Sequence, residues 1–403
     1  MTRRVVITGA GTINALGHDV PDTLAAMREG RCGIGPLNIQ DVGRLSIRIG
    51  AQVSGYRPED HFSRQQLALF DRFTQFTLLA ADQAVSASGI DFDGELGATA
   101  GVVLGTAAGG VVTWDENYRT VYEEGKNRVH PFVVPKLMNS AATAHVSMRF
   151  GLQGPVYTVT TACASSNHAM GQAFGMIRAG VADAMITGGS ESMLCFGGVK
   201  AWEGLRVMSQ TGCRPFSASR DGMVQGEGAA VFVFEEYERA RARGADILAE
   251  ISGFAMTSDA SDIVMPSQHG EARAIAGALR DAGLAAEDVG YINAHGTGTA
   301  ANDRTECAAI AEVFGPHAGA LPISSTKSMH GHLIGGTGAV ELLACIMALR
   351  DGVIAPTIGY DRPDPDCPLD VVPNQARQAR VGAALSNAFA FGGMNAVVAL
   401  KRV

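Results

Sequence analysis

A cysteine at a predicted junction between a strand and a helix is the first residue whose type and position could do chemistry. Residues 156–161 are mostly β-branched, as in a buried strand, and residues 167–178 have the apolar spacing of a helix. Cys163 lies between them, where unpaired backbone N–H groups and the helix dipole favour a thiolate. The sequence therefore offers a nucleophile here. A small buried cysteine is also a common core residue, and both interpretations stay open.

A histidine follows a second predicted strand, over residues 289–294. The segment 293–299, Asn-Ala-His-Gly-Thr-Gly-Thr, puts His295 at the carboxyl end of that strand, before a loop with two hydroxyl groups. Ligands of open α/β sheets bind at such strand ends, which favours a functional histidine. A structural histidine satisfied by its neighbours is an equal alternative. The glycines also suggest phosphate binding, but no P-loop spacing follows them.

A polar segment bounded by glycines, residues 324–338, carries a lysine and two further histidines. Lys327 and His332 lie in this segment, and Glu341 follows on a predicted helix. A cation, an imidazole and a carboxylate placed in this way could form a buried hydrogen-bond network; the alternative is a solvated lysine. His330 and His332 could bind a metal ion, but no nearby cysteine or acidic cluster completes a ligand set. We therefore expect no metal at this site.

Strand and helix patterns alternate along the chain and must position these side chains. Such alternation predicts a parallel sheet covered by helices on both faces. The pattern restarts near residue 250, which predicts two similar halves in one body, residues 1–250 with the cysteine and 251–403 with the histidines.

The first predicted strand, residues 3–8, precedes a glycine-rich segment, Gly9-Ala10-Gly11. Because residue 14 is asparagine, the third glycine of a dinucleotide fingerprint is missing, and we expect a tight structural turn instead.

Composition and charge exclude several classes of function. The 403 residues are 46% hydrophobic and 18% charged, as in a globular protein with a large core. A net charge of −8 argues against nucleic acid or an anionic membrane as a partner, and no apolar run approaches the ~18 residues of a transmembrane helix. The apolar run at the N-terminus is too short for a signal peptide. Seven scattered cysteines without a CxxC motif disfavour a disulfide framework and indicate the reducing cytoplasm.

Four motifs, in this order and at these intervals, resemble the β-ketoacyl-[acyl-carrier-protein] synthases. They are TACASS around Cys163, NAHGTGT at 293–299, STKSMHGH at 325–332 and FAFGGMN at 389–395. The resemblance is to the elongating Cys-His-His type and runs from Arg4 to Lys401. It implies the α/β thiolase-like fold of that family, with five layers, α-β-α-β-α, built from two duplicated halves.

Shorter segments narrow the resemblance to a branch of the family. Ser165–Ala169, Asp262–Ser267 and Pro363–Cys367 are most similar to the nodulation-type enzymes, which make specialised and often polyunsaturated acyl chains. Polyene-forming ketosynthase subunits, which pair with a chain-length factor, are a close alternative, and housekeeping fatty-acid elongation is the more ordinary one. In each case the expected reaction extends an acyl chain by two carbons.

The resemblance implies roles for the residues of these motifs. Cys163 would accept the acyl chain from the phosphopantetheine of an acyl carrier protein, and its backbone N–H, with that of Phe391, would form the oxyanion hole. His295 and His332 would bind the carbonyl of malonyl-carrier protein and assist decarboxylation, because two Nε2–H donors stabilise the resulting enolate. Phe391 would also gate the acyl pocket. Apart from the phosphopantetheine of the substrates, no cofactor is expected.

Further residues would support this chemistry. Lys327 and Glu341 would hold the local hydrogen-bond network, and Lys327 would disfavour protonation of His332. Thr297 and Thr299 would contact the pantetheine arm.

Two groups of residues depart from the family pattern. Ala390 replaces a common glycine and Met394 a common threonine; the extra Cβ at position 390 would stiffen the gate loop and puts ordinary chain-length gating in doubt. The predicted helix start at 63–69 lacks the basic cluster with which housekeeping members dock the acidic carrier protein. The remaining candidates for docking, each equally well explained as a solvated surface residue, are Arg64, Arg72, Lys126, Arg128 and Arg206.

Three alternatives use related scaffolds. A degradative thiolase needs a second cysteine near the C-terminus, whereas the last one, Cys367, lies outside FAFGGMN. A starter synthase has asparagine in place of His332. A non-catalytic chain-length-factor-like subunit typically lacks the nucleophilic cysteine, which is present here. Because members of the family are dimers, we expect a homodimer, or a heterodimer with a chain-length-factor-like subunit, joined at strand 157–160.

Overall fold

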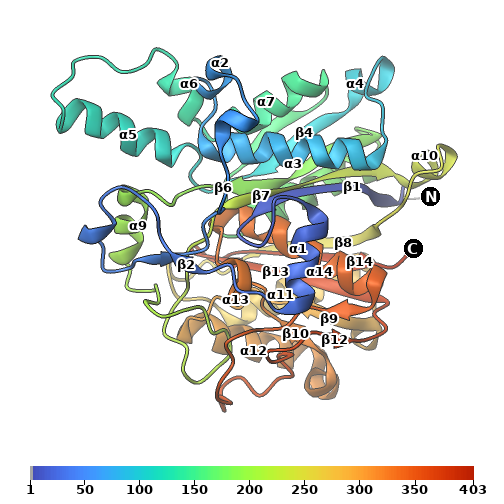
Figure 1. The fold of residues 1–403 in the computed structure, drawn as a ribbon. Helices are drawn as coiled ribbons and strands as arrows, with labels where there is room; N and C mark the ends of the chain where they lie inside the picture. The colour runs from blue at the N-terminus through green and yellow to red at the C-terminus, as the bar shows by residue number, and fades with distance from the viewer. Residues whose placement is uncertain (1–2) are drawn as a thin grey trace.

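A sheet of ten strands runs through the computed structural model, which describes residues 3–403 (Figure 1). Its strand order is β10-β9-β13-β14-β8-β1-β7-β6-β4-β5. These strands are β1 (Val5–Asn14), β4 (Gly101–Gly105), β5 (Val156–Val159), β6 (Ala184–Glu191), β7 (Gly228–Glu236), β8 (Ala249–Ser258), β9 (Val289–Asn293), β10 (Ile323–Ser324), β13 (Ala383–Ala390) and β14 (Met394–Lys401). Two small sheets pair β2 (Gly35–Pro36) with β3 (Ile49–Gly50) and β11 (Val353–Ile354) with β12 (Arg377–Gln378).

The large sheet repeats one arrangement twice. In the first half, the strands lie side by side in the order β5-β4-β6-β7-β1. Counted along the chain, these are the third, second, fourth, fifth and first strands of that half. The second half has the same order, β10-β9-β13-β14-β8. The two first strands, β1 and β8, pair antiparallel with Val5 opposite Ile251 and so join the halves. The expectation of duplicated halves is confirmed, while the predicted boundary at residue 250 falls inside β8 and stays a prediction.

Helices cover both halves and also fill the space between them. The helices are α1 (Val20–Glu29), α2 (Arg64–Leu67), α3 (Arg72–Ser88), α4 (Glu95–Thr99), α5 (Val111–Tyr122), α6 (Val133–Leu137), α7 (Ala141–Phe150), α8 (Ser165–Arg178), α9 (Phe196–Glu203), α10 (Tyr237–Ala242), α11 (Gln268–Ala282), α12 (Ala300–Phe314), α13 (Lys327–His330) and α14 (Thr337–Asp351).

The helices and sheets form the expected five layers (Figure 1). α3 and α7 pack on the outer face of the first half, and α11 packs on the outer face of the second half, with α12 against it. α8 and α14 lie between the halves and contact strands of both. None of the helices within residues 3–403 is long and apolar enough to cross a membrane.

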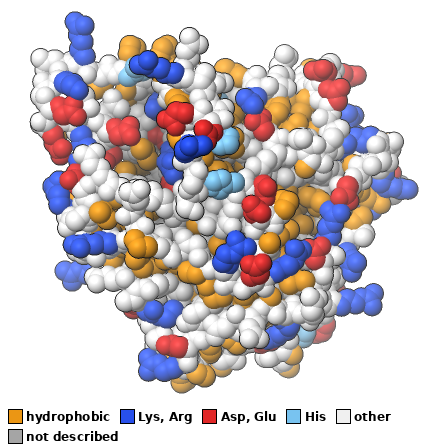
Figure 2. Space-filling view, viewed as in Figure 1, with side chains coloured by type: hydrophobic (Ala, Val, Ile, Leu, Met, Phe, Trp, Pro, Cys, Tyr) orange, Lys and Arg blue, Asp and Glu red, His pale blue; other side chains and the backbone are white. Residues whose placement is uncertain are grey.

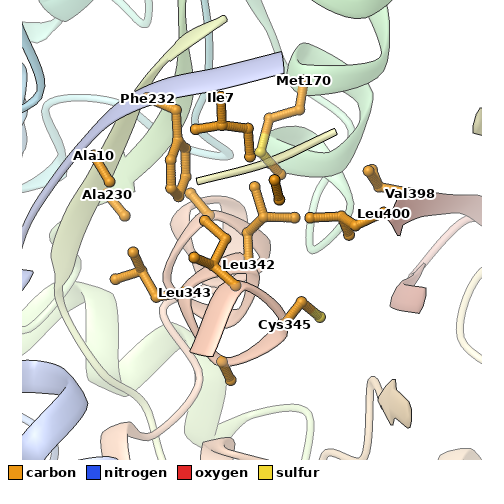
Figure 3. Close-up of a cluster of buried hydrophobic side chains, with 14 of the residues drawn as sticks. Ile7, Ala10, Met170, Ala230, Phe232, Leu342, Leu343, Cys345, Val398 and Leu400 are labelled. Carbon is orange, nitrogen blue, oxygen red and sulfur yellow. The ribbon is translucent and has the colours of Figure 1, made fainter. Parts of the chain in front are cut away.

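The two central helices belong to one core shared by both halves. Residues Thr337–Leu349 of α14 are all buried, as expected for a helix with sheet on two sides. Figure 3 shows Leu342 of α14 and Met170 of α8 among side chains of both halves, such as Phe232 of β7 and Leu400 of β14. Each fully buried side chain of this size contributes about 1.5–3 kcal/mol through removal from water. This core holds the two halves together, and each half supplies residues to the site described below.

The turn predicted at Gly9-Ala10-Gly11 is wrong, because β1 continues through these residues to Asn14. The glycines are required for close packing of α3 on the strand. A Cβ added at Gly9 would lie 2.1 Å from the Ala84 carbonyl oxygen, and one at Gly11 would lie 2.0 Å from that of Ala80. The sequence pattern therefore marks a contact between helix and sheet.

Candidate active site

Cys163 lies in the turn between β5 and α8, in a backbone geometry that side chains rarely adopt. Ala162 has a φ of 48°. The turn is held by Ser165, whose Oγ donates to the Ala162 carbonyl (2.7 Å) and accepts from the Thr161 N–H (2.9 Å). Left-handed backbone at a residue other than glycine costs about 1–2 kcal/mol and persists only where the surroundings fix it. α8 begins at Ser165 rather than at the predicted Asn167, so the cysteine lies two residues before the helix.

The thiol of Cys163 is removed from water. The residue is only 6% exposed, and burial raises the pKa of its thiol to about 12. The charge of Lys327 and the backbone N–H groups of Phe391 and of Cys163 itself oppose this rise. Burial thus opposes the stabilisation of a thiolate that the nearby helix terminus offers, and desolvation is the larger of the two effects. The two N–H groups beside the thiol are those predicted to form the oxyanion hole, and that role stays a prediction.

His332 faces the thiol, with its Nε2 3.2 Å from the Sγ of Cys163. Its other ring nitrogen, Nδ1, accepts a hydrogen bond from the Ile334 N–H (3.2 Å) and lies 2.8 Å from the Thr337 hydroxyl oxygen. Because a backbone N–H can only donate, Nδ1 carries no proton and the neutral ring carries its proton on Nε2. Burial and the charge of Lys327 lower the pKa of His332 well below its ordinary value. The ring is thus a neutral Nε2–H donor aimed at the cysteine.

His295 follows β9 and is held through its backbone. Its N–H and that of Gly296 each donate to one carboxylate oxygen of Glu306, both at 2.8 Å. Asn387 donates to the same carboxylate (3.1 Å). Burial and Lys327 lower the pKa of His295 well below its ordinary value, so this imidazole is also neutral.

Glu306 was not predicted from the sequence. It lies on α12, in the second turn of the helix that follows the His295 loop. Asp303, three residues earlier on the same face, accepts from the Gly298 N–H (3.1 Å) of that loop. Two acids at this spacing directly after a glycine-rich loop are the signal that could have identified them as loop anchors.

Lys327 and Glu341 form the expected buried hydrogen-bond network, but its third member is the backbone of His295 and not the imidazole of His332. The Lys327 Nζ donates to Glu341 Oε1 (2.6 Å) and to the backbone carbonyl oxygen of His295 (2.5 Å). The lysine therefore fixes the His295 backbone and does not bond to the ring of His332. Burial raises the pKa of Glu341 to about 7, although Lys327 opposes this.

The thiol and the two imidazoles meet in one place. The Cys163 Sγ and one ring nitrogen each of His295 and His332 all lie within 4.8 Å of one another. Within residues 3–403 this is the one group of histidine, cysteine or acidic residues that is close enough to hold a metal ion. His330 does not join it, because one of its ring nitrogens is bonded to Thr326 (2.9 Å) and the other to a backbone carbonyl. The absence of a resident metal stays a prediction.

A cavity of about 190 Å³ leads to these three residues. The exposed side chains of Val264 and Met265 mark its open end, and Cys163 lies at its buried end. The predicted gate residue Phe391 lines it and stacks on Trp202 of α9, with ring centroids 6.1 Å apart, a contact not predicted from the sequence. Other lining residues include Thr297, Thr299, His295, His332, Phe389, Ala390 and Asn302. Most of this lining is apolar, which suits an acyl chain.

The predicted docking residues do not form one basic patch. The expectation that Arg72 is available for docking is corrected by the structure. Its guanidinium forms an ion pair with the buried carboxylate of Glu227 (2.6 Å) and is not free to bind a partner. Lys126 pairs with the neighbouring Glu124 (2.6 Å). Figure 2 shows basic and acidic side chains interspersed over the face viewed. Arg64, Lys126, Arg128 and Arg206 are exposed, and their role in docking stays a prediction.

Comparisons with known proteins agree with this geometry. Residues 2–240 match the β-ketoacyl synthase N-terminal domain, and residues 248–361 match the C-terminal domain. The chain is 49% identical to nodulation protein E of Rhizobium sp. (strain N33) over all of both chains. It is 40% identical to 3-oxoacyl-[acyl-carrier-protein] synthase 2 of Staphylococcus aureus (strain N315), over 99% of this chain and 98% of that protein.

A solved structure titled the ishigamide ketosynthase/chain length factor has the same fold. Its TM-score is 0.96 at 34% sequence identity, and the match covers all of both chains. The thiolase-like fold expected from the sequence is therefore confirmed. With both domains matched and a cysteine and two histidines together in one cavity, the chain belongs to the β-ketoacyl synthase family and is a condensing enzyme.

Proposed function

We propose that this protein is an elongating β-ketoacyl-[acyl-carrier-protein] synthase in which Cys163 carries the acyl chain and His295 and His332 stabilise the enolate. The observation that carries the proposal is the group of three reactive atoms within 4.8 Å of one another at the buried end of an apolar cavity. A nucleophile that is also a good leaving group is needed for two successive acyl transfers, and a thiol meets both needs.

Acyl transfer is the first half-reaction. The Cys163 sulfur attacks the thioester carbonyl of the acyl-carrier protein, and the bond from that carbonyl to the pantetheine sulfur breaks. The proton that Cys163 loses leaves with the pantetheine thiol. Because burial raises the pKa of the Cys163 thiol, its proton departs as the attack proceeds in this proposal. The backbone N–H groups of Cys163 and Phe391 stabilise the tetrahedral oxyanion, as their closeness to the sulfur supports.

Decarboxylative condensation is the second half-reaction. Malonyl-carrier protein loses CO₂, and the electron pair of the broken bond passes into an enolate whose oxygen accepts Nε2–H bonds from His295 and His332. The enolate carbon attacks the carbonyl of the Cys163 thioester, and the cysteine sulfur leaves as a thiolate that takes up a proton from water. The low pKa of both imidazoles supports this role, because a neutral Nε2–H donor needs no acidic medium. Each donor contributes about 3–4 kcal/mol to such an oxyanion.

Supporting residues keep the donors in place and receive the pantetheine arm. Lys327, bound to Glu341 and to the His295 backbone, orients His295 and keeps both imidazoles neutral. Thr297 and Thr299 line the cavity and present hydroxyl groups to the amides of phosphopantetheine. We propose no cofactor beyond that phosphopantetheine.

The carrier protein docks, in our proposal, around the open end of the cavity. Arg206 is exposed there, beside Val207 of the cavity lining, and shares a surface depression with Lys200. Because Lys200 pairs with Glu203 (2.7 Å), Arg206 is the cation of this depression that we propose for contact with the acidic surface of a carrier protein.

We further propose a dimer joined at β5. This strand lies at the edge of the sheet, and Val156 at its start is 38% exposed, so its free backbone groups can pair with a second sheet. The segment 111–138, which contains α5 and α6 and leads to Asn139 beside Thr160, exposes large apolar side chains, as buried interfaces require. They are Trp114, Tyr118, Tyr122, Phe132, Val134 and Met138.

A heterodimer with a chain-length-factor-like subunit is the second candidate assembly. The observation that favours it is the likeness to a ketosynthase solved together with such a factor. Purification from the native host distinguishes the two: a homodimer yields one chain, whereas the heterodimer yields a second, homologous chain in equal amount.

All seven cysteines are free thiols, which supports the cytoplasm as the compartment.

The test of the proposed function is the loading of the enzyme with an acyl group. Wild type incubated with acyl-carrier protein gains one acyl mass by intact-protein mass spectrometry, Cys163→Ala gains none, and Cys32→Ala, which lacks an exposed cysteine outside the cavity, gains one. Equal loading of Cys163→Ala and wild type would show that another residue is the nucleophile.

A further inference from the structure

Glu191 is a fully buried carboxylate that the proposed chemistry does not use. It is the last residue of β6 and has no exposed surface. Two other buried glutamates of the first half are neutralised by arginine: Glu227 by Arg72 and Glu235 by Arg243. The hydrogen-bond donors of Glu191 are all neutral, and burial raises the pKa of its carboxyl to about 7 against their opposing effect.

The four donors to Glu191 come from two loops. After β4, the Thr106 hydroxyl (3.0 Å) and the Ala108 N–H (3.3 Å) donate to Oε1, and the Ala107 N–H (2.6 Å) donates to Oε2. The fourth donor is the Gly335 N–H, which reaches Oε2 at 3.1 Å from the other half of the molecule. One carboxylate therefore ties a loop of the first half to a loop of the second.

The second of these loops directly supports His332. Gly335 lies in the short helix Ile334–Gly336, and the N–H of Ile334 is the donor that fixes the proton on Nε2 of His332. Ile334 has a φ of 48°, so this backbone needs external contacts to hold its shape. The loop also packs without spare room, because a Cβ at Gly335 would lie 2.3 Å from the Ala107 nitrogen.

We propose that Glu191 is a positioning residue that clamps the loop after His332 onto the loop after β4 and thereby sets the approach of His332 to Cys163. This inference rests on the role proposed above for His332. Without the carboxylate, the N–H groups of Ala107, Ala108 and Gly335 lose their common acceptor, and buried N–H groups without an acceptor drive a local rearrangement. The Ile334 N–H then moves away from Nδ1, and the 3.2 Å contact between Nε2 and Sγ lengthens.

Two variants of Glu191 separate positioning from general stability. Glu191→Ala removes every acceptor, whereas the carbonyl of Glu191→Gln still accepts from Ala107 and Gly335 and keeps the two loops joined. We expect Glu191→Ala to lower kcat for condensation about tenfold with KM for malonyl-carrier protein unchanged, and Glu191→Gln to stay within about twofold of wild type. Assays run well below the thermal midpoint of each variant; if Glu191→Ala does not fold, Glu191→Asp, whose shorter side chain cannot reach both loops, takes its place.

Repeating the substitution without His332 tests whether Glu191 acts through that residue. In a His332→Ala background, Glu191→Ala is expected to add less than about twofold, because the positioned side chain is already missing. An equal loss with and without His332 would overturn the proposal, as would a Glu191→Gln enzyme as slow as Glu191→Ala.

A second readout does not depend on condensation. The Nε2–H of His332 assists ionisation of the Cys163 thiol, so iodoacetamide should modify Cys163 several-fold more slowly in Glu191→Ala than in wild type, and at the wild-type rate in Glu191→Gln. Equal rates in all three proteins would contradict the clamp. If iodoacetamide alkylates Cys163 of the wild-type protein but the protein does not condense malonyl thioesters, the proposed function fails. The alkylation rates of the Glu191 variants then still decide the role of Glu191.

Discussion

Each half of the molecule contributes one turn to the active site, and the two turns share a backbone angle but differ in the residue that follows it. In the first half, Ala162 has a φ of 48° and lies three residues before α8. In the second half, Ile334 has the same φ of 48° and lies three residues before α14. The residue that follows is Cys163 in the first turn and Gly335 in the second. Both turns lead into the central helices that share one core.

The difference between the two turns assigns them different tasks. The first turn carries a side chain and presents the thiol to the cavity. The second turn carries none at the equivalent position, and the backbone there packs against Ala107 and donates to Glu191. It supports His332, which precedes it. Turns with the same φ and the same spacing before a helix thus hold the nucleophile in one half and anchor the donor facing it in the other.

The largest expected effect comes from removing the donors that the second half supplies. His332→Ala and His295→Ala should each lower the rate of malonyl decarboxylation about 10²- to 10³-fold, because each removes one hydrogen bond to the enolate oxygen. Loading of Cys163 should persist in both variants, since the first half retains the nucleophile and its backbone N–H groups. Single-turnover assays of loading and of CO₂ release check this, and a variant that loses both steps equally would break the division between the two halves.

Giving the second turn a side chain should have a smaller effect. The Cβ of Gly335→Ala would clash with the Ala107 nitrogen at 2.3 Å and with Glu191 Oε2 at 2.7 Å, so we expect the free energy of unfolding to fall by about 1–3 kcal/mol. Gly319→Ala is the matched control, because its Cβ meets no atom within 4 Å. Denaturant titrations of the three proteins measure the difference; a Gly335→Ala protein as stable as the control would contradict the tight packing.

The smallest effect sharpens the account of the first turn. Because burial raises the pKa of Cys163 to about 12, its thiolate fraction should grow about tenfold for each pH unit between pH 7 and pH 9. The rate of alkylation by iodoacetamide should rise in proportion, with Cys163→Ala reporting the background from the exposed Cys32. A rate that levels off near neutral pH would instead indicate that the helix terminus outweighs desolvation.

The strand and helix patterns predicted an α/β fold, whereas the roles of Cys163, His295 and His332 were left open by their local signals and were implied by the resemblance of four motifs to one family. A cysteine between strand and helix patterns, and histidines within glycine-bounded motifs, are visible within a few positions of each other. The restart of the strand and helix pattern near residue 250 likewise predicted the duplication seen in the strand order.

What the sequence did not predict depends on contacts between distant segments or on burial. Glu191 is separated from its donors Ala107 and Gly335 by 84 and 144 positions, and no local pattern marks such a contact. Arg72 appeared available for docking because its partner Glu227 lies 155 positions away. The helix terminus beside Cys163 can be inferred from the sequence, whereas the burial that raises the pKa of its thiol cannot.

The most direct test of the central claim follows one acyl group through both half-reactions. Wild type is loaded with an acyl chain from its carrier protein, freed of excess donor, and mixed with malonyl-carrier protein, and both proteins are weighed by mass spectrometry over time. The account predicts that the acyl mass on the Cys163 peptide disappears as a β-ketoacyl chain two carbons longer appears on the carrier protein. An acyl mass that stays on Cys163, or a product that forms while another residue carries the chain, would contradict it.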